Sequence, residues 1–212
     1  MAIRRVYFLK DNKIKFQDFD IKWNSGFSIK QKQRNIALLH DEISAYYQIN
    51  KGEILEISTK SKDELGRELS SFNLTMIHNG IKYPLECVYQ SSKVFKNVIE
   101  EYQVLEVLEA SPSLAKKRLS EEDHNNLIGF RCFGKSFPLE PSYLFYDWLY
   151  INSINNISNL KERILKYNYF TDIEFNPQKS HSCQARSLAL YKWLMINNRL
   201  EDYIKNPEMF YK

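Results

Sequence analysis

The sequence of 212 residues is poor in residues that cross-link, break or loosen a chain, with 3 cysteines, 6 glycines and 6 prolines. So little glycine and proline excludes long flexible linkers, and we expect a single domain over residues 1–212. Cys87, Cys132 and Cys183 are odd in number and widely spaced, which favours reduced cytosolic thiols over disulfides or a zinc site. No His-Glu-x-x-His or paired-cysteine signature is present, so no metal site is predicted.

Other absences narrow the class of protein. No apolar run approaches the roughly 20 residues of a membrane span, and no signal core follows the first five residues, so we expect a cytoplasmic protein without membrane contact. There is no glycine-rich phosphate loop and no dinucleotide fingerprint. The net charge of +4 permits a nucleic-acid partner without arguing for one. The hydrophobic share of 43% and the aromatic share of 14% are enough for a substantial core.

The pattern of apolar residues predicts a mixture of helices and short strands. Strands 3–9 and 14–21 form a hairpin, and Asn79-Gly80 marks a second one. A helix begins after Ser28 as its cap, runs to about Tyr47 and has Ile29 on its apolar face. The remaining expectations are a strand at 53–58, a loop at 60–68, helices at 99–108, 111–117, 143–154, 160–167 and 184–197, an extended segment at 170–175, and a strand or helix at 127–133.

The stretch 82–95 concentrates chemistry on one predicted helix. Pro84 suits the first helical turn, and Leu85, Val88 and Phe95 form its apolar stripe. Another face carries, at spacings of i, i+4 and i+7, an acid, an amide and an amine: Glu86, Gln90 and Lys93. Such a set serves acid–base or amine chemistry, but it is also the pattern of a solvated ion pair on a helix surface.

Several motifs in a fixed order resemble the NADAR family, also called YbiA-like. They are Leu69-Ser70-Ser71-Phe72-Asn73, then Asn79-Gly80 and Tyr83, then Glu86, Tyr89, Gln90 and Lys93 as an acid-x-x-Tyr-Gln-x-x-Lys pattern, then Ser111-Pro112-Ser113-Leu114-Ala115-Lys116. The family's Asp-x-x-Trp-Gly ending is not present, and Asp172 or Glu174 is the candidate replacement for its acid. The resemblance implies an α+β, mainly α fold with small β-hairpins.

The rest of the chain resembles the subgroup encoded beside DarT-type DNA-modifying toxins. The motifs are the segments 22–28, 31–36, 138–141, 146–150, 170–177 and 184–187. We therefore interpret residues 1–60 as a subgroup-specific part and residues 69–200 as the family core.

This resemblance implies an N-glycoside hydrolase that removes ADP-ribose from guanine bases of DNA and so acts as antitoxin to a DarT-type ADP-ribosyltransferase. ADP-ribosylated DNA is then the macromolecular partner, the toxin is linked in function, and ADP-ribose is a product rather than a cofactor. Two alternatives stay open: a non-catalytic sensor of ADP-ribose or another NAD derivative, and a hydrolase of a small-metabolite N-glycoside.

The chemistry of N-glycoside cleavage assigns expected roles to residues in these motifs. Lys93 forms a Schiff base with the opened ribose or holds the substrate electrostatically, and Glu86 acts as general base or proton shuttle. Lys30 and Arg34, next to the Trp23-Asn24-x-Gly26 element, are expected to bind the diphosphate. The other expected substrate contacts are stacking by Trp23, Tyr89 and Trp148, although Trp148 is equally a core residue, and a ribose hydrogen bond from Asn73.

Overall fold

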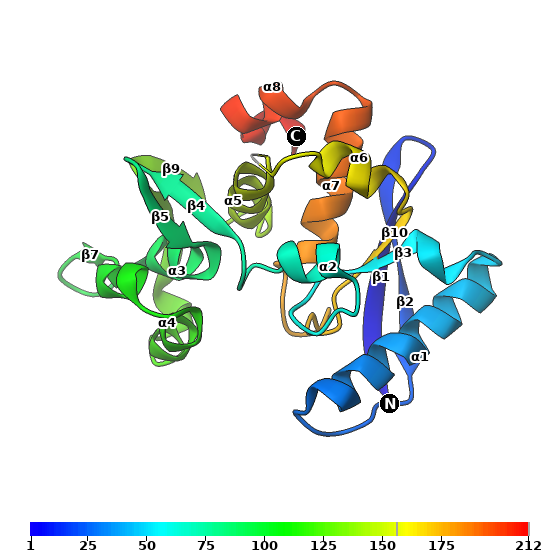
Figure 1. The fold of residues 1–212 in the computed structure, drawn as a ribbon. Helices are drawn as coiled ribbons and strands as arrows, with labels where there is room; N and C mark the ends of the chain where they lie inside the picture. Colours follow the sequence, from blue (N-terminus) through cyan, green and yellow to red (C-terminus); the bar gives the residue numbers. More distant parts are fainter. Residues whose placement is uncertain (156, 212) are drawn as a thin grey trace.

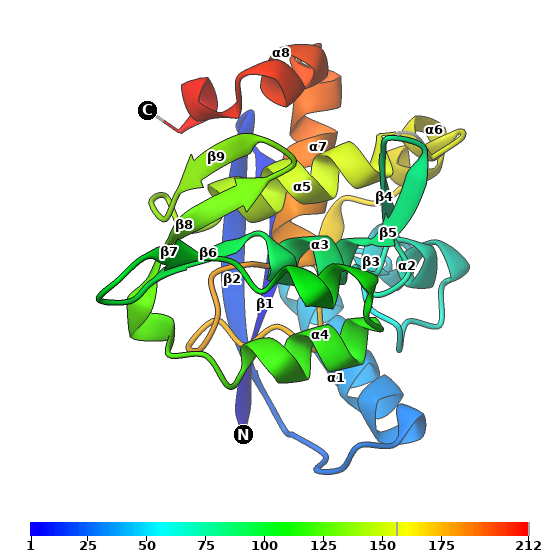
Figure 2. The ribbon, with the colours of Figure 1, turned by 90° about the vertical axis from the view of Figure 1, so that its left-hand side faces the viewer.

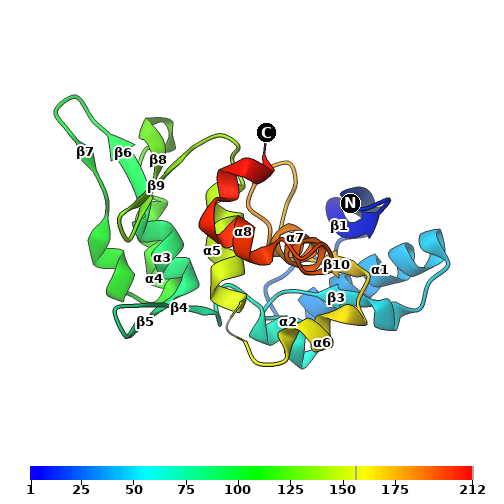
Figure 3. The ribbon, with the colours of Figure 1, turned by 90° about the horizontal axis from the view of Figure 1, so that it is seen from above.

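The structure is a computed structural model that describes residues 1–155 and 157–211. The predicted single domain also contains Asn156 and Lys212, which lie outside the described residues. Helices and short strands alternate along the chain, which confirms the α+β class (Figure 1). Its elements gather in two lobes, with α5 (Leu144–Ile154) and α7 (Gln184–Ile196) between them (Figures 1 and 3).

The first lobe is built on a four-stranded sheet of order β2-β1-β10-β3. Its strands are β1 (Ala2–Lys10), β2 (Lys13–Ile21), β3 (Ile54–Glu56) and β10 (Tyr169–Thr171). The β1–β2 hairpin is confirmed, β10 pairs antiparallel with β1, and β3 pairs parallel with β10. Because β3 and β10 run in the same direction, the loops that follow them leave the sheet at the same edge, where the site lies.

Helix α1 (Ile29–Tyr47) covers this sheet. It begins with a capping box between Ser28 and Gln31, which confirms Ser28 as the predicted cap. Ile36, Leu39 and Ile43 are buried in a cluster with residues of the sheet. Ile29, expected on the same face, is the first residue of the helix and is 55% exposed. Short elements follow: a 3-10 turn (Lys51–Glu53), and α2 (Glu64–Glu68).

The second lobe contains an antiparallel sheet of order β7-β6-β8-β9 with α3 and α4 beside it (Figure 2). Its elements are the β4–β5 hairpin (Thr75–His78 and Ile81–Pro84), α3 (Leu85–Ser91), β6 (Lys93–Lys96), β7 (Glu101–Tyr102), a 3-10 turn (Leu105–Glu109), α4 (Pro112–Leu119), a 3-10 turn (His124–Asn126), β8 (Leu127–Cys132) and β9 (Lys135–Pro138). The Asn79-Gly80 hairpin is confirmed, as is the start of α4 with Ser111 as its cap.

The main hydrophobic core surrounds α5 and α7, both of which were predicted as helices. Most residues of α5 are buried, because the helix passes through the middle of the molecule (Figure 3). The chain closes with α6 (Leu160–Leu165), α8 (Leu200–Lys205) and a 3-10 turn (Pro207–Phe210).

Three sequence-based expectations were wrong. The helix expected through 95 ends at Ser91, because the hydroxyls of Ser91 and Ser92 bond to the Val88 carbonyl and the next residues pair with β8. The loop 60–68 contains α2, which Asp63 caps. Residues 99–108 form β7 and a 3-10 turn, because Glu101–Tyr102 pair with β6.

Candidate functional site

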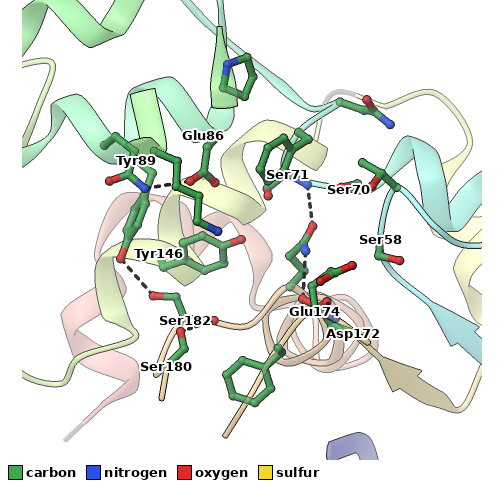
Figure 4. Close-up of a pocket in the computed structure, with 18 of the residues that line it drawn as sticks. Ser58, Ser70, Ser71, Glu86, Tyr89, Tyr146, Asp172, Glu174, Ser180 and Ser182 are labelled. Carbon is green, nitrogen blue, oxygen red and sulfur yellow. Dashed lines mark hydrogen bonds between the residues drawn. The ribbon is translucent and has the colours of Figure 1, made fainter. Parts of the chain in front are cut away.

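A cleft of about 850 Å³ lies between the two lobes. Figure 4 shows the side chains that line it, with Glu86 and Tyr89 on one side and Asp172 and Glu174 on the other. The first wall comes from α3, the start of β6 and the start of α4. The second comes from the segments that follow β3 and β10 and from Gln184 at the start of α7. The cleft is therefore assembled from segments that are far apart in the sequence.

On the first wall, the predicted acid, amide and amine do come together. Glu86 is 6% exposed and Lys93 is 8% exposed, and both line the cleft. The Gln90 side-chain amide donates to Glu86 Oε1 at 2.8 Å, which fixes the carboxylate in place. Glu86 and Lys93 are therefore buried side chains of the cleft wall and not a solvated pair on a helix surface. Lys93 reaches the cleft from the first residue of β6 and not from the helix that carries Glu86.

The amine of Lys93 is in an unusual environment for a lysine. Burial lowers its pKa to about 8, and the nearby charge of Lys116 acts in the same direction. The carboxylate of Glu86 opposes this shift without cancelling it. Lys93 Nζ lies 5.5 Å from the centre of the Tyr89 ring. A useful fraction of this amine is therefore neutral near pH 7, which amine nucleophiles require.

Tyr89 anchors this wall and presents its hydroxyl to the cleft. Its ring packs against Phe130 and Phe145 and meets Tyr146 edge-on. Its hydroxyl lies 3.3 Å from Ser182 Oγ, across the cleft floor (Figure 4). The ring faces are thus occupied by the core, and Phe72, an aromatic cleft residue that is 37% exposed, offers a freer surface for stacking a base.

On the second wall, the carboxyl group of Asp172 accepts hydrogen bonds from two N–H groups of the protein. Its Oδ2 accepts from the Gln184 side-chain amide at 2.9 Å, and its Oδ1 accepts from the Glu174 backbone at 3.0 Å. Gln184 is itself oriented by the Ser71 backbone amide, which donates to its Oε1 at 2.6 Å (Figure 4). Burial, and then the negative charge of Glu56, raise the pKa of Asp172 to about 7 against these hydrogen bonds.

Glu174 lies at the mouth of the cleft and connects it to the N-terminal part of the chain. Lys32 of α1 forms an ion pair with Glu174 at 2.9 Å. The Lys32 amine lies 5.3 Å from the centre of the Trp23 ring, on which Arg4 also stacks. Trp23 therefore supports the residues of the rim and does not line the cleft itself.

The predicted site residues divide into two groups. Those that line the cleft are Asn73, Glu86, Tyr89, Gln90, Lys93, Asp172 and Glu174. Those that do not line it are Trp23, Asn24, Gly26, Lys30, Arg34 and Trp148. The second group, apart from Trp148, belongs to the segment before α1 and to its first turns, which pack on the β1–β2 side of the molecule.

The structure explains why each residue of the second group lies outside the cleft. Lys30 and Arg34 are exposed on α1. Asn24 donates twice to Asn35 Oδ1, and Gly26 has a positive φ of 127° beside the Gln31 side chain. For Trp148, the structure favours the core alternative. Its ring is 6% exposed and packs on Phe137, and its indole N–H donates to the Ile204 carbonyl at 3.1 Å.

Sequence reasoning missed a set of polar and basic residues that line the cleft. They are Ser58, Lys60, Ser70, Ser71, Ser113, Lys116, Tyr146, Ser180, Ser182 and Gln184. Six of them lie inside the motifs that carry the family resemblance, so that signal is present in the sequence: Ser70, Ser71, Ser113, Lys116, Tyr146 and Gln184. The serines after β3 and around 180 lie in segments whose position depends on tertiary structure.

Comparison with known protein families identifies one that matches nearly the whole chain. The family model NADAR-DarT1, described as the DarT1-associated NADAR antitoxin, matches residues 2–212. The chain therefore belongs to the DarT1-associated NADAR antitoxin family. No curated protein sequence gives a significant match. Within the described residues, no helix combines the length and apolar character needed to cross a membrane.

Proposed function

We propose that this protein is an N-glycoside hydrolase that removes ADP-ribose from guanine bases of DNA and thereby reverses the modification made by a DarT1-type toxin. The observation that carries the proposal is the pair Glu86 and Lys93, both buried on one wall of a cleft large enough for a nucleotide. Membership of an antitoxin family supports the biological role. The toxin is a partner in function, and ADP-ribosylated DNA is the proposed substrate.

The proposed reaction passes through a Schiff base on Lys93. Opening of the ribose ring gives an imine between the anomeric carbon and the base nitrogen, and the neutral amine of Lys93 attacks that carbon. The bond to the base nitrogen breaks, and the base leaves after taking up a proton. Water then adds to the imine on Lys93, which releases ADP-ribose and restores the amine. The lowered pKa of Lys93 supports this route, because an ammonium group has no lone pair for the attack.

Glu86 acts as the proton acceptor on the same wall. An attacking amine and an adding water molecule each lose a proton, and the buried carboxylate of Glu86 lies beside Lys93. The hydrogen bond from Gln90 holds one carboxylate oxygen and fixes its orientation. Gln90 therefore positions the general base.

The remaining cleft residues suit the parts of ADP-ribose. Lys60 and Lys116 provide positive charge for the diphosphate, in place of the predicted Lys30 and Arg34. The carboxylates of Asp172 and Glu174 and the amide of Asn73 are acceptors or donors for ribose hydroxyls. Phe72 offers a ring for stacking a purine, and the Lys116 amine lies 6.0 Å from its centre.

The test is to incubate the protein with an oligonucleotide that carries ADP-ribose on guanine and to measure free ADP-ribose by chromatography. We expect wild-type protein to release ADP-ribose and Lys93→Ala to lose activity by at least about a hundredfold, the lower end for loss of a catalytic group. Lys96→Ala is the matched control, because Lys96 lies on the same strand and is exposed.

The same assay separates the alternatives. Tight binding of ADP-ribosylated DNA without release would identify a sensor. Release from a small N-glycoside with no action on DNA would identify a metabolite hydrolase. Full activity of Lys93→Ala would remove this residue from the mechanism.

A further inference from the structure

The loop between β2 and α1 presents an aromatic side chain to solvent. Phe27 is 98% exposed, and Ile29, at the start of α1, is exposed as well. In Figures 1 and 2 this end of α1 and the loop before it project from the body of the first lobe. A single exposed apolar side chain is ordinary on a protein surface. Phe27 differs from such residues in how its loop is fixed, in the charge beside it and in its place next to the cleft.

Hydrogen bonds inside the protein fix the loop at its base. The side-chain oxygen of Asn35, a fully buried residue, accepts from the Asn24 backbone at 2.8 Å and from the Asn24 side chain at 3.0 Å. The Asn35 amide donates to the Asn24 carbonyl at 3.0 Å. Gly26 has a φ of 127°, and a side chain at this position would collide with that of Gln31. The backbone beside Phe27 is therefore held in a defined conformation that leaves the ring in solvent.

The segment around Phe27 is strongly basic. Residues 22–34 contain no acid and four basic residues, which are Lys22, Lys30, Lys32 and Arg34. Lys32 is paired with Glu174, and the other three are exposed. Within residues 1–155 and 157–211, none of these three forms an ion pair. Lys30 and Arg34 are four positions apart and share one face of α1, so their charges are available together to an anionic partner.

Two contacts attach this basic segment to the cleft. Lys32 bonds to Glu174 at 2.9 Å, and the side-chain amide of Gln33 donates to the Lys60 carbonyl at 3.3 Å. Glu174 and Lys60 both line the cleft. Phe27 precedes Lys32 by five residues, most of them in the first turn of the helix, so their Cα atoms lie within about 10 Å of each other. Phe27 is therefore close to the rim of the second wall.

We propose that Phe27, Lys30 and Arg34 form a strand-binding surface, which holds the DNA strand that carries the modified base. Phe27 stacks on an unpaired neighbouring base, and Lys30 and Arg34 contact phosphates. The inference rests on the proposed function. An enzyme that acts on a base takes it out of the stack, so with ADP-ribose in the cleft the neighbouring nucleotides lie across its rim. Aromatic rings beside basic side chains bind single strands in a sequence-tolerant way.

The first test measures binding of an unmodified single-stranded oligonucleotide of about 12 nucleotides by fluorescence anisotropy at several salt concentrations. We expect Phe27→Ala to weaken binding about tenfold without changing its salt dependence, because stacking involves no charge. In the double variant Lys30→Ala and Arg34→Ala, the slope of log K against log salt should become shallower by about 1.4, or about 0.7 for each lost phosphate contact. All three side chains are exposed, so the variants should fold normally.

Controls elsewhere on the surface match these changes. Ile99→Ala removes a side chain that is 91% exposed in the turn between β6 and β7. The double variant Lys13→Ala and Lys15→Ala removes two exposed charges from the other end of β2. Both controls should bind the oligonucleotide within about twofold of wild type. A loss in the controls as large as in the variants would mean that binding follows net charge or exposed apolar area, and would overturn the inference.

The second test compares two modified substrates, an oligonucleotide and a single nucleoside that each carry ADP-ribose on guanine. We expect Phe27→Ala to lower kcat/KM about tenfold on the oligonucleotide and to leave the nucleoside unaffected, because the nucleoside has no neighbouring base. Equal losses on both substrates would show that Phe27 acts through the cleft, and would overturn the inference. If wild-type protein releases ADP-ribose from neither substrate, the proposed function fails, and the binding test still decides whether the strand-binding surface exists.

Other occupants of this surface give different results. Wild-type affinity and salt dependence in both variants would overturn the inference. If DNA affinity is unchanged but Phe27→Ala converts a dimer into a monomer in gel filtration, a second copy of the chain covers the surface. If DNA affinity is unchanged but Phe27→Ala abolishes binding to vesicles of anionic phospholipid, the surface belongs to a membrane contact.

Discussion

The buried carboxyl of Asp172 makes a prediction about stability that does not depend on the reaction. Its pKa is raised from 3.8 in the unfolded chain to about 7 in the folded protein. The folded protein therefore binds a proton that the unfolded chain releases, and this contribution to stability is present at low pH and lost as the pH rises through 7. Above pH 7 the buried carboxyl of Asp172 is ionised in the folded protein, and the free energy of unfolding is lower by the full cost of burying that charge.

The difference between the two pKa values, 7 − 3.8, is about 3 units and corresponds to roughly 4 kcal/mol as an upper value. Asp172→Asn removes this dependence but replaces one acceptor with an amide that faces Gln184, at a cost of about 1–3 kcal/mol at every pH. We therefore expect the stability of the variant relative to wild type to improve by about 2–4 kcal/mol between pH 4.5 and pH 8.

Urea unfolding followed by tryptophan fluorescence at these two pH values measures the change. Asp20→Asn is the control, because Asp20 is exposed on β2. The reasoning is refuted if the stability difference between Asp172→Asn and wild type is the same at both pH values, or if it moves against the variant as the pH rises.

Three further predictions concern the cleft and the core. Lys116→Ala should weaken binding of free ADP-ribose by about tenfold in calorimetry, the value of one charge-assisted hydrogen bond, whereas Lys30→Ala, outside the cleft, should leave it within about twofold. Glu86→Gln should slow ADP-ribose release at least about a hundredfold, and near wild-type release would make Glu86 only a structural partner of Lys93. Trp148→Ala should lower the free energy of unfolding by about 3–5 kcal/mol in urea denaturation, and a loss below about 1 kcal/mol would contradict its place in the core.

Local signals predicted the parts of the fold whose structure depends on neighbouring residues. The β1–β2 hairpin, the Ser28 and Ser111 caps and the Asn79-Gly80 turn each follow from side chains within a few positions. The errors occurred where tertiary pairing overrode a local pattern. Residues 92–95 continue an apolar helical spacing, yet they pair with β8, which lies more than thirty positions further on.

The candidate site was predictable in part for the same reason. The order of the motifs identifies Glu86, Gln90 and Lys93 as candidate site residues, and the structure places all three in the cleft. Glu86 and Gln90 lie on a helix and Lys93 lies on a strand, whereas the spacing predicts one helix for all three. The environment of Asp172 depends on Gln184 and on Glu56, residues that no spacing rule connects to it. The prediction that Lys30 and Arg34 bind substrate rests on their positive charge next to a motif. Charge alone does not determine which surface of a helix faces a cleft.

The most direct test of the central claim is borohydride reduction during turnover of DNA that carries ADP-ribose on guanine. A Schiff base becomes a stable secondary amine, which peptide mass spectrometry locates. The account predicts an ADP-ribose adduct on Lys93, absent without substrate and absent from Lys93→Ala. Turnover that continues with no adduct on Lys93, or adducts spread over exposed lysines such as Lys96, would contradict it.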